Sequence, residues 1–92
     1  MKHELEIQHK WLVRILVGEK SFEVRLNDRD FQVGDTINFF PLHNEKETVN
    51  AYDYQSPIPL YAITYVHSGL GMAEGYVVLG IKGLTAQKEG VR

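Results

Sequence analysis

The sequence predicts a small, mainly β domain, folded as a mixed β-barrel with one or two short helices. Apolar and polar residues alternate over several short stretches of the 92-residue chain, which is the pattern of half-buried strands. One stretch close to the N-terminus instead spaces its apolar residues for a helix. The order of strand, helix and several further strands is typical of a small mixed barrel.

The predicted helix spans residues 9–17 and follows a first strand over residues 3–7. Gly18 stands where a helix end favours a residue able to adopt positive φ, so we expect the helix to end there. Trp11 is expected to anchor the helix in the barrel rather than to contact a ligand. The apolar residues at helical spacing are Trp11, Leu12, Ile15 and Leu16.

The remaining elements are predicted as strands joined by turns. Residues 21–26 alternate cleanly, and we expect Phe22, Val24 and Leu26 to face the core because they are the apolar set. Residues 76–81 are apolar enough to be buried on both faces of a sheet. Other apolar alternations typical of strands lie at residues 31–33 and 37–39, and residues 60–66 are predicted as a strand because they are rich in aromatic and β-branched residues.

Two segments between these elements are predicted as loops. Residues 41–59 show no apolar period and are expected to form a long exposed loop. Residues 68–75 carry three glycines and are expected to form a second loop. Residues 82–92 are polar and predict a flexible C-terminal tail, so residues 1–92 are interpreted as one domain with its core at about 3–81.

Composition narrows the class of protein. The chain has 43% hydrophobic and 24% charged residues, as an ordinary soluble globular chain does, and no cysteine for disulfides or thiolate metal sites. Its formal net charge of −2 argues against tight non-specific binding of nucleic acid, which needs a basic face. Neither a membrane span nor a signal peptide is predicted, so the cytoplasm is the expected location.

Scattered histidines and tyrosines offer few further sites. The histidines lack the short spacing that metal ligands share, so neither a metal site nor a cofactor is expected. They are His3, His9, His43 and His67. The tyrosines could present ring faces for base stacking, although most are expected in the core or at its rim. They are Tyr52, Tyr54, Tyr61, Tyr65 and Tyr76.

The segment from Gly18 to Arg25 reads G-E-K-S-F-E-V-R and resembles the G-x-K-x-x-E-x-R signature of the ASCH family in the PUA-like superfamily. Residues 31–37 look like that family's next hairpin, and residues 74–81 look like its closing strand. The resemblance covers residues 3–81 and is closest to a small, often phage-associated branch whose function is not established. It implies a PUA-like barrel.

The same segment predicts a polar cleft from its residues alone. Glu23 and Arg25 share a strand face opposite the apolar set, Ser21 lies on that face, and Lys20 stands at its mouth. An ammonium, a carboxylate and a guanidinium together suit a phosphate or a nucleobase edge. The alternative is an exposed ion pair worth little. As a ligand contact, Arg25 is expected to be dispensable for stability.

The resemblance implies recognition of RNA or of a modified nucleotide as the leading function. In that interpretation Lys20 and Arg25 contact phosphate, and Glu23 accepts hydrogen bonds from a base or orients Arg25. Ser21 completes the candidate ligand-binding set. The oligomeric state stays open.

Two alternatives stay open beside recognition. A relative in the ASCH family is an amidohydrolase acting on acylated cytidine nucleosides, and Lys20 and Glu74 match its lysine and late glutamate. Glu23 replaces its threonine nucleophile, so only a water-based variant using Lys20, Glu23 and Glu74 is conceivable. The other alternative is a protein-interaction module that binds through residues 41–59.

Overall fold

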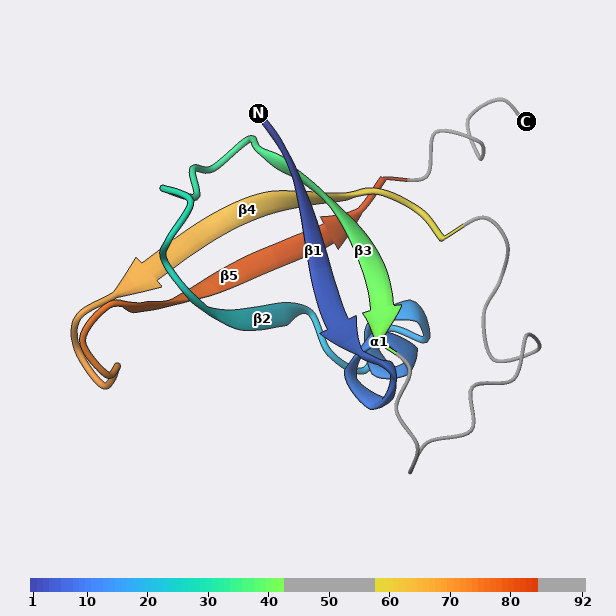
Figure 1. The fold of residues 1–92 in the computed structure, drawn as a ribbon, viewed down its shortest axis with the longest axis horizontal. Helices are drawn as coiled ribbons and strands as arrows, with labels where there is room; N and C mark the ends of the chain where they lie inside the picture. Colours follow the sequence, from blue (N-terminus) through green and yellow to red (C-terminus); the bar gives the residue numbers. More distant parts are fainter. Residues whose placement is uncertain (43–57, 85–92) are drawn as a thin grey trace.

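A computed structural model describes residues 1–42 and 58–84 of the chain. This part of the chain is mainly β with one short helix, which confirms the predicted class (Figure 1). The elements in chain order are β1 (Lys2–Gln8), α1 (His9–Leu16), β2 (Phe22–Leu26), β3 (Thr36–Leu42), β4 (Tyr61–Ser68) and β5 (Tyr76–Gly83).

The strands form one mixed sheet that is not closed into a barrel. Its order is β1-β3-β4-β5-β2, with β1 parallel to β3 and the other pairs antiparallel. The pairing of β3 with β4 covers only Thr36 with Ala62 and Ile37 with Tyr61, so the two halves of the sheet diverge beyond that point. The edge strands β1 and β2 therefore stay unpaired with each other, and the closed barrel that the sequence predicts is wrong.

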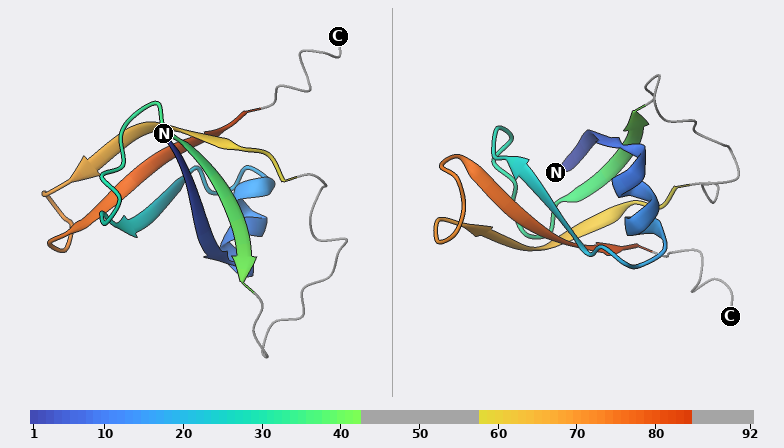
Figure 2. Two further views of the ribbon diagram at one scale, coloured as in Figure 1. Left: turned by 45° about the horizontal axis from the view of Figure 1, so that its top comes forward. Right: turned by 90° about the horizontal axis from the view of Figure 1, so that it is seen from below.

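Strongly coiled, the sheet encloses the core between its own two halves. Figure 2 shows β1 and β3 on one side, β2, β5 and β4 on the other, and α1 at one end. Apolar side chains from all three groups meet there, as expected for two layers around one core. The buried apolar residues are Leu5, Ile7, Leu12, Ile15, Phe31, Ile37, Phe39, Tyr61, Ile63, Val77, Leu79 and Ile81.

Helix α1 forms where predicted, but Trp11 is not its anchor. Leu12 and Ile15 are the buried residues of the helix, and the chain leaves it through Gly18, whose φ is +87°. Trp11 keeps 39% of its surface exposed. Leu12 and Ile15 share the core-facing side because they are three residues apart, which turns Trp11 about 100° away toward the rim.

Strand β2 alternates as predicted but faces the other way. Glu23 is 6% exposed and points inward, whereas Phe22, Val24 and Leu26 are between 43% and 49% exposed. The expected inward direction of the apolar set is therefore wrong. Glu23 can be buried because two cationic side chains neutralise it, as described below.

Strand β5 is also buried on one face only, contrary to the prediction for residues 76–81. Val77, Leu79 and Ile81 are buried, while Tyr76 is 42% exposed. The second face lies on the outside of the sheet, where no described element covers it (Figure 2).

Other boundaries also differ from the predictions. Residues 31–33 form no strand. Pro41 and Leu42 belong to β3, and Lys82 and Gly83 belong to β5, because strand pairing continues through them. Residues 43–57 of the predicted loop and residues 85–92 of the predicted tail lie outside the described residues. The last two residues of the predicted loop, 58 and 59, are described and lead toward β4. Of the predicted loop at residues 68–75, the first residue is the end of β4 and residues 69–75 join β4 to β5. The three glycines of this loop have positive φ.

Candidate functional site

The motif residues meet around the buried carboxylate of Glu23. Lys20 Nζ donates to Glu23 Oε2 at 3.1 Å, and Arg25 Nε donates to Glu23 Oε1 at 3.3 Å. The side chain of Glu23 is only 7% exposed, those of Lys20 and Arg25 15% and 22%. Each carboxylate oxygen thus has one cationic partner, and the three side chains together carry a formal charge of +1. This group is called the Glu23 cluster below.

Arg25 also spans the gap between the two sheet edges. Its Nη2 donates to the main-chain carbonyl of Glu6 on β1 at 2.6 Å. Arg29, which follows β2, makes the same kind of contact to the carbonyl of Glu4 at 2.9 Å. Two arginine side chains therefore replace the strand pairing that is missing between β1 and β2. The sequence carries no signal for this role, because the partners are main-chain atoms.

Lys20 is held on several sides. Its Nζ donates to the main-chain carbonyl of Phe22 at 2.6 Å. The same ammonium lies 4.4 Å from the ring centroid of Phe22 and 5.8 Å from that of Trp11, where the ring faces attract a cation. Lys20 therefore fixes the cluster in place more than it offers free donors.

A groove of about 420 Å³ lies beside the Glu23 cluster. This volume falls within the usual range of small-ligand pockets, about 300–1,000 Å³. A guanidinium presents five donors, and Arg25 uses its Nε and one Nη2 hydrogen in the contacts given above. The groove is lined by Glu6, Ile7, Gln8, Trp11, Glu23, Val24, Arg25, Leu26, Leu42 and Tyr76.

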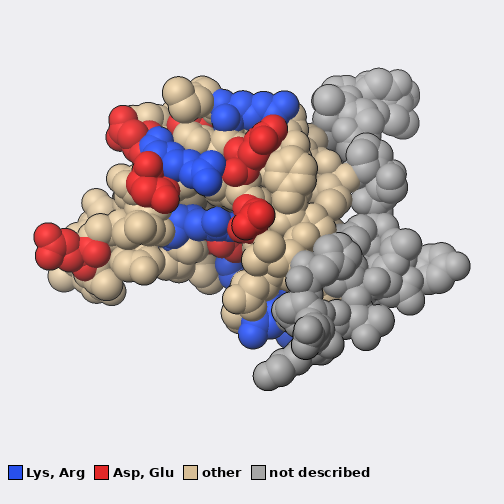
Figure 3. Space-filling view, viewed as in Figure 1, with Lys and Arg blue, Asp and Glu red and all other residues tan. Residues whose placement is uncertain are grey.

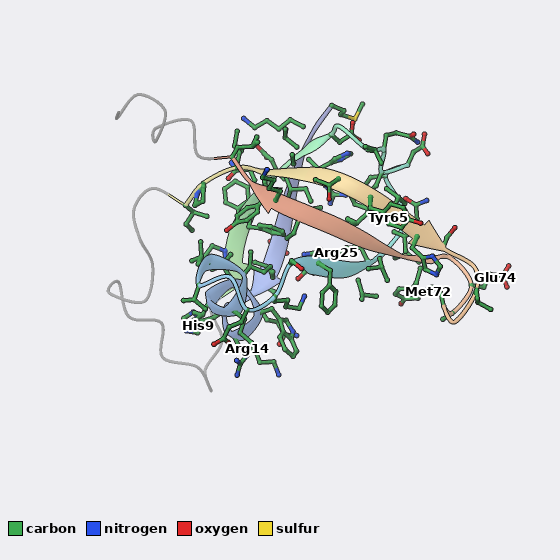
Figure 4. The ribbon with its side chains drawn as sticks, turned by 180° about the vertical axis from the view of Figure 1, so that it is seen from behind. His9, Arg14, Arg25, Tyr65, Met72 and Glu74 are labelled. Carbon is green, nitrogen blue, oxygen red and sulfur yellow. The ribbon has the colours of Figure 1, made fainter. Side chains whose placement is uncertain are left out.

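Glu74 and Ser21 do not join this cluster. Glu74 lies at the end of the β4–β5 hairpin, whereas Arg25 lies on β2 (Figure 4). A second pocket of about 370 Å³ includes Glu74 in its lining; it shares Tyr76 with the groove beside the Glu23 cluster, and neither Glu23 nor Arg25 takes part in it. Ser21 is exposed, and its main-chain carbonyl accepts a 3.0 Å hydrogen bond from the N–H of Ile81. The structure thus does not assemble Lys20, Glu23 and Glu74 into one catalytic set.

The tyrosines that the structure describes divide between core and surface. Tyr61 is 7% exposed and belongs to the core, whereas Tyr65 is 64% and Tyr76 42% exposed. Tyr52 and Tyr54 lie outside the described residues. Tyr65 and Tyr76 therefore have ring surface available to a ligand.

A second buried polar pair, His3 with Asp35, escaped the sequence reasoning. His3 Nε2 lies 2.8 Å from Asp35 Oδ2, and both residues are buried. The hydrogen bond with His3, and then the bond to the N-terminal amine of Met1, lower the pKa of Asp35 from 3.8 to about 2. The carboxylate also accepts the main-chain N–H of Gln32, so this pair fixes the turn before β3 onto β1.

Among the described residues, no group of histidine, aspartate and glutamate side chains could hold a metal ion. His67 Nε2 lies 2.9 Å from the carbonyl of Leu70, within the β4–β5 hairpin.

No helix of the described residues is long and apolar enough to cross a membrane. Figure 3 shows lysine and arginine side chains interleaved with aspartate and glutamate on the face seen in Figure 1.

Comparison with known proteins gives one family and no functional assignment. None of the curated proteins compared matches the chain. The family described as a domain of unknown function, DUF3850, matches residues 2–81, which include all of β1 to β4, the Glu23 cluster and most of β5. Because this match spans most of the 92 residues, the chain belongs to the DUF3850 family.

Proposed function

We propose that the chain is a recognition module of the ASCH and PUA-like kind that binds RNA or a modified nucleotide. One nucleotide occupies the groove beside the Glu23 cluster. The observation that carries this proposal is the composition of that groove, where Trp11 and Tyr76 line the same space as the partly buried guanidinium of Arg25. Aromatic faces with a few convergent polar groups are typical of small-ligand sites.

The groove offers a distinct partner for each part of a nucleotide. The rings of Trp11 and Tyr76 are available for stacking on a base. Arg25 donates from its remaining N–H groups to a base carbonyl or a phosphate oxygen, and Glu23 holds the guanidinium in orientation through the 3.3 Å contact. The interleaved charges in Figure 3 limit the number of phosphate contacts, so binding is modest and weakens with salt.

The position of Trp11 provides the test. It is the chain's only tryptophan and lines the groove, so its fluorescence reports directly on a stacked base. Titration with nucleoside monophosphates, including cytidine and N4-acetylcytidine forms, is expected to quench Trp11 in a saturable way. Arg25→Lys keeps the charge but loses the planar fork, and is expected to weaken binding about tenfold.

Arg14→Ala is the matched control for that titration, because Arg14 is an exposed arginine that pairs with Glu19 away from the groove. It is expected to bind as the wild type does. Absence of saturable quenching by every nucleotide, or equal affinity of the wild type and Arg25→Lys, would remove the support for the proposed site.

A further inference from the structure

The outer face of the β2–β5–β4 half-sheet is a continuous apolar surface. Residues that pair directly across antiparallel strands point to the same side of a sheet. The register therefore places Phe22, Gly80 and Tyr65 in one row across the three strands, and Val24, Val78 and His67 in the next. A third row joins Leu26 to Tyr76. These eight residues are called the outer face.

Three aromatic rings dominate this face, and they are widely exposed. Tyr65 is 64%, Phe22 43% and Tyr76 42% exposed. In β2 the fold turns the apolar side chains outward and buries Glu23 instead, although burial of the apolar set would give the larger hydrophobic stabilisation. Hydrophobic burial alone would turn these apolar side chains inward. A large apolar surface that is exposed instead is typical of an interaction site.

Gly80 keeps the face flat between two of the rings. It pairs with Phe22 on one side and with Tyr65 on the other. A Cβ atom added at Gly80 would lie 3.1 Å from Thr64 Oγ1 and 3.3 Å from Tyr65 Cβ, so a side chain is poorly accommodated there. A residue with a side chain at position 80 would therefore crowd Thr64 and Tyr65, and glycine leaves no side chain between the two rings.

Charge at the rim favours an anionic occupant. Lys82 follows Gly80 on the same side of β5, whereas the Lys20 ammonium, 4.4 Å from the Phe22 ring, is already paired with Glu23. In the described strands β2, β4 and β5, no aspartate or glutamate occupies an outward position, in contrast to the mixed surface of Figure 3. Bases on aromatic rings with lysines nearby are the general pattern of single-strand binding.

We propose that the outer face binds a single-stranded nucleic acid whose successive bases stack on its exposed rings. The strand passes from the groove onto this face, because Val24, Leu26 and Tyr76 line both. Figure 4 shows Tyr65 on β4 and Arg25 on β2, on either side of β5. The inference rests on the proposed function and adds a second contact region to it.

Fluorescence anisotropy with labelled octamers of uridine RNA and thymidine DNA tests this inference. Tyr65→Ala is expected to bind both octamers at least about fivefold more weakly than the wild type, since stacking on one ring is worth that much or more. Tyr65→Phe keeps the ring and is expected to bind normally. Val33→Ala is the control, because Val33 is 61% exposed in a loop away from the outer face.

The outcomes separate this inference from the proposed function. Suppose that uridine monophosphate quenches Trp11. If the octamers then bind no more tightly than this nucleotide, or bind Tyr65→Ala as tightly as the wild type, the inference about the outer face is overturned and the proposed groove is kept. Octamer binding that needs the Tyr65 ring, without any quenching of Trp11, supports the outer face and overturns the groove. Self-association of the wild type that Tyr65→Ala abolishes, without octamer binding, assigns the face to a second copy and overturns the inference.

Discussion

Arg25 Nη2 donates a 2.6 Å hydrogen bond to the main-chain carbonyl of Glu6, across the gap between the two unpaired edges of the sheet. The same guanidinium contacts Glu23 through Nε at 3.3 Å. One side chain thus ties the motif, the buried carboxylate and strand β1 together. Arg25, which the sequence motif predicts as a ligand contact, therefore also connects parts of the fold.

Arg25→Ala is therefore expected to lower stability as well as binding. Glu23 would keep only Lys20 as a partner while remaining buried, and a buried polar group that loses a partner costs about 1–3 kcal/mol. Thermal or urea unfolding followed by circular dichroism measures this loss. Arg14→Ala, at an exposed pair, is expected to change stability by less than about 0.5 kcal/mol. An unchanged melting temperature in Arg25→Ala would show that the bridge to Glu6 contributes nothing.

Acid is expected to destabilise the protein partly through Asp35. Its pKa is lowered from 3.8 to about 2 in the folded chain, so its carboxylate stabilises the fold above pH 3.8. That contribution is lost as the pH falls toward about 2, because the Asp35 carboxylate then takes up a proton in the folded chain as it already has in the unfolded chain. Melting temperatures measured from neutral pH down to pH 2 should fall more steeply in the wild type than in Asp35→Asn. Asp30→Asn, at an exposed position, is the control, and parallel curves for the wild type and Asp35→Asn would contradict the assignment.

No hydrolysis of N4-acetylcytidine is expected. A hydroxyl nucleophile needs an activating base beside it, and Glu23 stands three residues after Lys20, where the amidohydrolase of the ASCH family that the motif resembles has threonine. Lys20 Nζ donates to Glu23 and to the carbonyl of Phe22, while Glu74 lines a different pocket. Chromatography of cytidine released by the purified protein tests this directly. Turnover that disappears in both Lys20→Ala and Glu74→Ala would make the enzyme interpretation the leading one.

Much of the fold follows from local patterns in the sequence. The alternation at residues 3–7 and the helical spacing before Gly18 predicted β1 and α1, because these elements expose one side and bury the other. The aromatic and β-branched residues at 60–66 predicted β4. The direction in which β2 faces did not follow from alternation. Glu23 is buried through its pairing with Lys20 and Arg25, and a period of two marks the faces of a strand without saying which is inside.

Contacts between distant segments account for what the sequence could not predict. A closed barrel needs its edge strands β1 and β2 to pair, and the side chains of Arg25 and Arg29 contact the main chain of β1 instead. His3 and Asp35 are separated by 32 positions, and neither residue type signals burial on its own. The motif did predict that Lys20, Glu23 and Arg25 lie close together, since a strand places alternate residues on one face. It could not show that main-chain carbonyls occupy part of their donor capacity.

The central claim is that a nucleotide binds in the groove beside the Glu23 cluster, and ¹H–¹⁵N NMR of the labelled protein tests it most directly. Titration with cytidine or uridine monophosphate is predicted to shift two side-chain signals first, the indole N–H of Trp11 and the Nε–H of Arg25, because both residues line the groove. The signals of Glu74 and Gly69, which line the hairpin pocket and not the groove, are predicted to stay unchanged. Shifts confined to the hairpin pocket, or no shifts at saturating nucleotide, would contradict the claim.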